Sequence, residues 1–240
     1  MDEYIVTLED RKQVAQDTMA FWFHVAGSDY NFRAGQNAAF TLLDPPETDA
    51  AGNIRTLSVA SSPNTPTSLM VAMRMRKSAF KNSLKILPLG TKLRVSSPMG
   101  SFTLHRDSSR PAVFLAGGIG ITPVLSILAH ATEEGLPHRI YLFYSNHEPE
   151  KAAFLSELQM WQKTNVNFTF IPTVTTPNGS SWLYERGRIE PEMLSRYLND
   201  LHAPVYYVCG PAEMVAAMQK VLAHLGVDDD SIRTEEFGGY

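Results

Sequence analysis

The sequence predicts two domains, a small antiparallel β-barrel followed by a doubly wound α/β domain. The first hundred residues hold short β segments separated by turns rich in Gly, Pro, Asn and Asp. From Arg110 onward, buried-type strands alternate with segments of helical periodicity, which is the pattern of a parallel sheet. We therefore expect a first domain at residues 1–106 and a second at residues 111–240, joined through residues 104–111.

The expected elements follow in chain order. In the first domain we expect strands at residues 4–11, 18–26, 37–43, 54–61, 68–76 and 91–98. In the second domain we expect strands at residues 112–117, 139–145, 166–174 and 205–210, and helices at residues 122–134, 151–163, 190–200 and 211–225.

Composition restricts the class of protein. With 240 residues, 44% of them hydrophobic, the chain can fill two modest cores. Its apolar runs are too short to cross a bilayer and its first residues are acidic, so we expect a cytoplasmic protein. The single cysteine, Cys209, excludes an internal disulfide and a self-held iron–sulfur cluster, and the seven histidines lack metal-ligand spacing. Because neither residue type offers a metal site, any redox centre must be an organic cofactor or belong to a partner. The net charge of −4 argues weakly against general nucleic-acid binding.

The stretch "FLAGGIGITPVLSIL" joins a strand to a helix through glycines. Gly117, Gly118 and Gly120 let the backbone turn sharply and approach a ligand, and Pro123 suits the first turn of a helix. Amides at such a helix start favour a pyrophosphate. The third glycine of the dinucleotide fingerprint is absent, and a tight connection without any ligand would explain the same residues.

Two further stretches, "RTLSVASSP" at residues 55–63 and "VCGPAEM" at residues 208–214, flank this turn in the sequence. Together and in this order the three motifs resemble the ferredoxin–NADP reductase family of FAD-binding, FR-type flavin oxidoreductases. The resemblance covers nearly the whole chain. It implies a flavin-binding barrel followed by a nicotinamide-nucleotide domain, in a stand-alone form without an iron–sulfur domain, with FAD more expected than FMN.

The first motif would contact the flavin. The resemblance implies that Arg55 binds flavin phosphate and that Ser58 lies beside flavin N5, with Thr56 and Leu57 between them in the cofactor site. Leu57 stands where the family has tyrosine, and it can neither stack as an aromatic nor donate a phenolic hydrogen bond. A surface strand with a solvated arginine is the alternative explanation.

A second flavin segment follows at residues 78–102. The resemblance puts Ala79, Phe80 and Lys81 at a short helix start that offers amides to the pyrophosphate. On the preceding strand we add Met73 and Arg74 to the cofactor site, although period-two alternation puts their side chains on opposite faces. For Arg74, a plain solvated strand face is an equal alternative.

The second domain would receive the nucleotide. The resemblance implies that the glycine turn binds it, with Pro123 in the same motif and Thr122 near the contact between flavin and nicotinamide. Cys209, followed by Gly210 and Pro211, would lie beside the nicotinamide C4 region. A small buried core residue is the alternative for the cysteine, and we do not expect it to act as a nucleophile.

The chain ends "TEEFGGY". The resemblance implies an aromatic residue that covers the flavin face, and Phe237 fits the family's Glu-x-aromatic ending better than Tyr240 does. A frayed tail is the alternative. We therefore expect Ser58, Cys209 and Phe237 to be the catalytic residues.

The expected activity is electron transfer from NADPH or NADH through FAD to a separate acceptor. The segment at residues 144–151, with Asn146, His147, Glu148 and Lys151, leaves the choice of nucleotide open. Residues 71–104 carry seven Lys or Arg and no Asp or Glu, which favours an acidic carrier such as a ferredoxin or flavodoxin. Balance of the flavin phosphate charge explains the same excess equally well. A non-catalytic nucleotide-binding or electron-transfer subunit of a larger complex is the alternative function.

Overall fold

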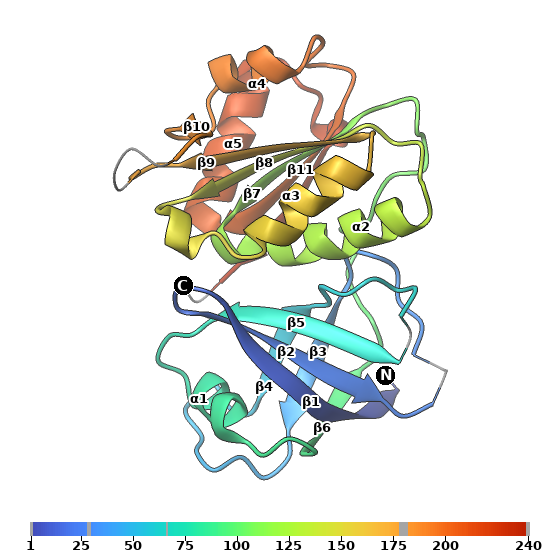
Figure 1. The fold of residues 1–240 in the computed structure, drawn as a ribbon, viewed down its shortest axis with the longest axis vertical. Coiled ribbons are helices and arrows are strands. Elements are labelled where there is room, and N and C mark those ends of the chain that lie inside the picture. Colours follow the sequence, from blue (N-terminus) through green and yellow to red (C-terminus); the bar gives the residue numbers. More distant parts are fainter. Residues whose placement is uncertain (1, 28–29, 66, 178–181, 239–240) are drawn as a thin grey trace.

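Two six-stranded sheets follow each other along the chain and stack as two halves, a lower barrel and an upper α/β half (Figure 1). The computed structural model describes residues 2–27, 30–65, 67–177 and 182–238. An antiparallel first sheet followed by a parallel second sheet with helices confirms the predicted fold class.

All strand pairs of the barrel are antiparallel, in the order β4-β3-β6-β1-β2-β5. Just after β4, the Ala60 N–H donates to the Met70 carbonyl oxygen of β5 at 2.7 Å, so the two edge strands meet. The strands are β1 Glu3–Ala15, β2 Thr18–Val25, β3 Asn37–Leu42, β4 Ile54–Ser58, β5 Ser68–Arg74 and β6 Lys92–Ser96.

Alternation along the strands fills the barrel. On β3, Ala38, Phe40 and Leu42 are fully buried while the residues between them are half-buried. A single short helix, α1 (Ala79–Ile86), closes the barrel by burying Phe80 and Leu84 in the same core. The side of this helix that faces solvent is left free to take part in a site.

The α/β half is a parallel sheet in the order β10-β9-β8-β7-β11-β12. Its strands are β7 Ala112–Gly117, β8 Ile140–Asn146, β9 Phe168–Val174, β10 Glu185–Arg186, β11 Val205–Pro211 and β12 Ile232–Phe237. Its helices are α2 Ile121–Glu133, α3 Leu155–Thr164, α4 Pro191–Tyr197 and α5 Ala212–His224.

Helices cover both faces of this sheet, which explains why β7 is buried along its whole length. Phe114 belongs to the cluster with α2 and α3, and the neighbouring Leu115 to the cluster with α4 and α5. Among the described residues, none of the helices has the length and apolar character needed to cross a membrane.

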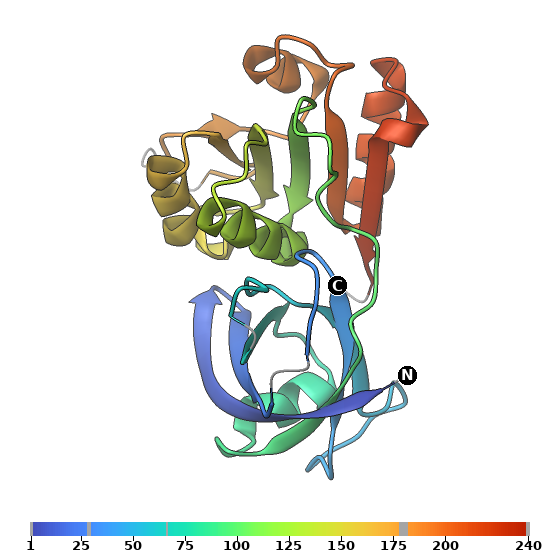
Figure 2. The ribbon, with the colours of Figure 1, turned by 90° about the vertical axis from the view of Figure 1, so that its right-hand side faces the viewer.

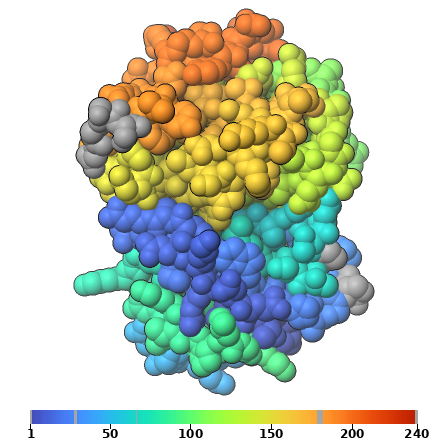
Figure 3. Space-filling model, in the orientation of Figure 1, coloured from blue at the N-terminus to red at the C-terminus, as the bar shows by residue number. Residues whose placement is uncertain are grey.

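The halves are joined at a seam that runs below α2 and α3. The Ser126 hydroxyl donates to the Ser61 carbonyl oxygen at 2.7 Å, and the Gln16 N–H donates to the Glu150 carbonyl oxygen at 2.8 Å. The space-filling view shows the two halves in contact across the whole of this face (Figure 3). Figure 2 shows the last strand, β12, descending from the sheet to the barrel.

Some elements differ from the sequence prediction. The helix expected at residues 151–163 begins only at Leu155, because Phe154 has a left-handed φ of +61° and separates it from a 3-10 turn at Pro149–Lys151. The strand β12 was not predicted, because its polar sequence IRTEEF pairs only with β11 at the sheet edge and needs no apolar run.

Candidate functional site

The glycine turn lies at the carboxyl end of β7. It is a 3-10 turn, Gly118–Gly120, followed at once by α2. Gly118 has φ +53°, the left-handed region that favours glycine. At Gly120 an added Cβ would lie 2.5 Å from the Cys209 carbonyl oxygen, so a side chain has no room there. Backbone packing thus accounts for Gly120, whereas Gly117 and Gly118 face a cavity.

That cavity has a volume of about 280 Å³. Its walls come from the carboxyl ends of β7, β8, β9 and β11, the edge at which open parallel sheets bind ligands. Gly117, Gly118 and Pro211 line it from the sheet, and Arg74 lines it from the barrel. The structure therefore brings the predicted nucleotide turn and one predicted flavin-site arginine to the same opening.

Three predicted residues of the turn do not line the cavity. Thr122 is 1% exposed, and its hydroxyl donates to the Ile119 carbonyl oxygen at 3.0 Å. Pro123 and Gly120 are also buried. The side chains of Thr122 and Pro123 support the turn in this structure, and their predicted part in the nucleotide site stays a prediction.

Cys209 and Gly210 end β11 beside the turn. The Cys209 side chain is fully buried, and burial, with a smaller contribution from the Glu235 charge, raises the pKa of the thiol. A protonated, buried thiol is a poor nucleophile. Gly210 packs against Gly117, where an added Cβ would lie 3.2 Å from the Gly117 nitrogen.

A carboxyl group crosses the seam next to Cys209. Glu235, on β12, is in register with Cys209, and its Oε1 accepts from Asn37 Nδ2 at 3.4 Å and from Ser58 Oγ at 3.5 Å. Its Oε2 is buried and has no hydrogen-bond partner in the described part of the chain. Burial raises the pKa of Glu235, and the two donors from the barrel lower it by less.

Sequence reasoning missed Glu235, although it is the Glu of the Glu-x-aromatic ending. That pattern predicted a role for the aromatic residue alone. Phe237 ends β12 in register with Pro211, a residue of the cavity wall, so the predicted lid lies at the cavity edge. The other predicted lid, Tyr240, lies outside the described residues.

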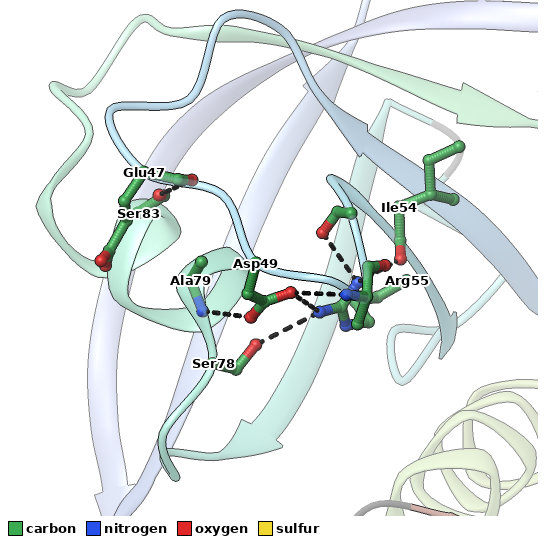
Figure 4. Close-up of polar contacts among 9 residues, drawn as sticks. Glu47, Asp49, Ile54, Arg55, Ser78, Ala79 and Ser83 are labelled. Carbon is green, nitrogen blue, oxygen red and sulfur yellow. Dashed lines mark hydrogen bonds and ion pairs between the residues drawn. The ribbon is translucent and has the colours of Figure 1, made fainter.

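On the other side of the barrel, the carboxylate of Asp49 lies at the start of α1 (Figure 4). The Ala79 N–H donates to Asp49 Oδ2 at 2.8 Å, and Arg55 Nη2 lies 3.5 Å from Asp49 Oδ1. Arg55 Nη2 also donates to the Ser78 hydroxyl at 3.4 Å, and the guanidinium lies 5.3 Å from the centre of the Phe80 ring. Two residues predicted for the flavin phosphate thus converge on one negative group.

The other residues predicted for the flavin site differ in how deeply they are buried in the barrel. Met73 and Phe80 are 4% and 1% exposed in the barrel core, and their predicted place in the flavin site stays a prediction. Lys81 Nζ donates to the Arg74 carbonyl oxygen at 2.8 Å, and burial followed by the nearby arginines lowers its pKa. Leu57 is half-buried against the barrel core, and Thr56 is exposed.

The segment at residues 144–151, at the end of β8 and just after it, has only some of its polar residues in the cavity wall. Asn146 and His147 line it. Lys151 instead pairs with Glu148 at 3.2 Å, which neutralises the one cation that the sequence offered there for a 2′-phosphate. Arg188, which the sequence did not single out, lines the same cavity. The geometry thus leaves the choice between NADH and NADPH open.

Comparison with known proteins agrees with this geometry. Residues 114–220 match the family described as oxidoreductase NAD-binding domain. The chain is 26% identical over 214 residues to the reductase component of propane 2-monooxygenase from Rhodococcus jostii, covering 87% of this chain and 56% of that protein. It is 30% identical to one subunit of the Na(+)-translocating NADH-quinone reductase of Pseudoalteromonas atlantica, covering 84% of this chain and 48% of that protein. The chain thus spans about half the length of these curated relatives.

Solved structures share the fold. The flavohem-like FAD/NAD binding domain of nitric oxide dioxygenase from Vibrio cholerae superimposes with a TM-score of 0.87 at 18% identity, covering 100% of both chains. The cytochrome b5 reductase domain of Ulva prolifera nitrate reductase gives a TM-score of 0.83 at 18% identity, covering 98% of this chain and 97% of that one.

Proposed function

We propose that the chain is a member of the ferredoxin–NADP reductase family and that it moves electrons from NADH or NADPH through FAD to a separate acceptor. The observation that supports this most is the meeting of Ser58, Glu235 and Cys209 at the seam. It lies where a flavin-binding barrel and a nucleotide-binding sheet must share a reaction centre. We further propose residues 1–106 as the flavin-binding domain and residues 111–240 as the nucleotide-binding domain.

Whether the barrel can hold a flavin phosphate depends on the hydrogen-bond donors that it offers. Arg55 and the Ala79 N–H hold a carboxylate, so the same groups suit a phosphate oxygen. When bound, FAD supplies hydride acceptance and single-electron delivery. We propose FAD over FMN because the similar Vibrio domain is described as an FAD/NAD binding domain.

The chain's own residues would position the flavin, shield it from water and carry a proton. The Ser58 hydroxyl, which donates to Glu235 Oε1 at 3.5 Å, is the group expected beside flavin N5. Burial raises the pKa of the Glu235 carboxyl, which makes this group the candidate for carrying a proton at the seam. The small, buried Cys209 side chain would lie on the nicotinamide side of the seam. Phe237 would cover the flavin face until the nicotinamide takes its place.

The test is an anaerobic absorbance titration of the flavin-supplemented protein with NADH and, separately, NADPH. Bleaching of a bound flavin band supports the reductase and identifies the nucleotide. Bound flavin that neither nucleotide bleaches would favour the second candidate, an electron-transfer portion of a larger complex, which the similarity to a component of a quinone reductase brings forward. Absence of bound flavin would contradict the proposal.

Replacing Phe237 by alanine should lower the KM for the nucleotide several-fold, because the nicotinamide no longer has to displace a ring. The flavin absorbance band should shift at the same time. Steady-state kinetics and difference spectra of the protein check both effects, and Phe237→Tyr, which keeps the ring, is the control. If the alanine variant keeps the KM and the spectrum of the wild type, Phe237 is not the lid.

We propose an acidic electron carrier as the acceptor. Most of the positive charge of residues 71–104 reaches solvent, because the exposed residues of this segment include Arg76, Lys77, Lys85 and Lys92. Reduction of an acidic carrier should slow about tenfold between roughly 50 and 200 mM salt, because salt screens long-range attraction. Reduction of a neutral quinone by the same enzyme should change little. Equal salt dependence of the two rates would contradict steering.

The proposed compartment is the cytoplasm, where reduced nicotinamide nucleotides are available. Fractionation of cells followed by detection of the protein tests this, and recovery of the protein outside the cytoplasmic fraction would contradict it.

A further inference from the structure

The loop between β3 and β4 contributes the anion that sits at the start of α1. Asp49, on this loop, reaches the Ala79 N–H with Oδ2 and the Arg55 guanidinium with Oδ1 (Figure 4). The Ala79 N–H is the largest cause of a lowered pKa at Asp49, so the group is ionised at neutral pH. The site is therefore filled by a charge from the chain itself.

The same loop also holds the arginine. Arg55 Nη1 donates to the carbonyl oxygens of Ala51, Gly52 and Ile54 at 2.9, 3.0 and 2.7 Å. Two of these acceptors belong to the loop that carries Asp49. Arg55 and the loop thus form one unit, in which only the second amino group of the guanidinium faces the anion.

A phosphate and the Asp49 carboxylate cannot use this site together. A backbone N–H has one hydrogen to donate, and the one on Ala79 is already taken at 2.8 Å. Two negative groups beside one guanidinium also repel each other. An incoming phosphate must therefore remove the carboxylate.

The loop can release Asp49 without opening the core. The Asp49 side chain is 36% exposed, and residues 47–51 lie on the surface. The loop is attached to α1 separately, by the buried Ser83 hydroxyl donating to the Glu47 carbonyl oxygen at 3.3 Å. Rotation of the Asp49 side chain would break its bonds to the Ala79 N–H and, at 3.0 Å, to the Ala51 N–H of its own loop, while the attachment through Ser83 remains.

We propose that Asp49 is an internal competitor of the flavin phosphate: its carboxylate occupies the phosphate position on Arg55 and Ala79 and sets the affinity for phosphorylated flavins. The proposal rests on the proposed function, since it assumes that this site takes a flavin phosphate. Riboflavin, which has no phosphate, would not meet this competition.

The first experiment measures dissociation constants of FAD, FMN and riboflavin by flavin fluorescence. In Asp49→Asn the side-chain oxygen still accepts from the Ala79 N–H, but the charge is gone. FAD and FMN should bind about two- to fivefold more tightly than to the wild type, in line with the removal of one exposed charge pair, and riboflavin should be unchanged. Glu47→Gln removes a charge from the same loop outside the site and should behave as the wild type. Asp49→Ala should show the same direction, and circular dichroism confirms that each variant is folded.

The second experiment needs no flavin. Pyrophosphate is added to the wild type, Asp49→Asn and Glu47→Gln, and the melting temperature of each is followed. The rise should be larger in Asp49→Asn than in the other two. Weaker or unchanged FAD binding in Asp49→Asn, an equal change for all three flavins, or an equal pyrophosphate shift in all proteins would overturn the proposal. If no variant binds any flavin, the proposed function fails, and the pyrophosphate shift alone decides the role of Asp49.

Discussion

Replacing Glu235 by glutamine is expected to slow the reduction of bound flavin by the nucleotide about a hundredfold, a typical size for loss of a proton-carrying group. The variant keeps an oxygen that accepts from Asn37 and Ser58, but it has no proton to give or take. Stopped-flow absorbance of the flavin-loaded protein measures the rate. Glu236→Gln is the matched control, because Glu236 is the exposed neighbour on the same strand. A rate within twofold of the wild type would show that Glu235 has no part in the reaction.

The effect of Glu235→Gln on the free energy of unfolding should also depend on pH. Burial raises the pKa of Glu235 above its ordinary value of 4.5, so folding favours the neutral carboxyl. Its contribution is present below that value and is lost as the pH rises through the raised pKa of the folded state. The free energy of unfolding of Glu235→Gln, relative to the wild type, should therefore increase from about pH 4 to about pH 8. Urea melts at several pH values check this, and a gap that does not change with pH would contradict it.

Replacing Gly120 by alanine is expected to destabilise the protein by about 3 kcal/mol or more, because overpacking against backbone has no cheap relief. Gly120 has an ordinary helical φ of −58°, so the penalty comes from contact alone. The new Cβ would meet the Cys209 carbonyl oxygen at 2.5 Å and the Gly210 Cα at 2.7 Å. Neither atom can move without shifting β11 against the turn.

Gly118→Ala is the comparison for this prediction. Its left-handed φ of +53° costs about 1 kcal/mol for a non-glycine residue. Its nearest new neighbour, however, is the flexible Arg74 side chain at 3.3 Å. Urea denaturation midpoints of the two variants should therefore rank Gly120→Ala well below Gly118→Ala. Equal stability of the two would show that the contact at Gly120 is relieved in some other way.

Local sequence patterns were sufficient for most of the fold. The alternating residues of β3 reflect burial on one face of the sheet, and the fully apolar β7 reflects burial on both faces. Both patterns can be recognised in the sequence without a structure. The start of α3 was not readable, because it depends on a phenylalanine, Phe154, in a left-handed conformation that this residue seldom adopts. The polar strand β12 was missed because its place in the sheet comes from its partner, β11.

The candidate site was predictable where motifs are contiguous and not where groups meet across the fold. Arg55 and Ala79 were predicted through their motifs, but the charge between them comes from Asp49, on a loop without any motif. Likewise Ser58 was predicted from its motif, whereas its acceptor Glu235 lies 177 positions further along the chain. Pairings at such separations are set by the docking of the two halves and leave no local pattern.

The bond between Ser58 and Glu235 also limits how this protein can be recombined. The hydroxyl is supplied by one half and the carboxyl by the last strand of the other. A chimera that joins this barrel to a foreign nucleotide module would keep two complete binding surfaces and yet lose their shared centre, unless the new module ends in a strand with an acid at the same register. Under the proposed role of this pair, the two halves should be inherited together, and exchange between relatives should be tolerated only where both residues are exchanged together.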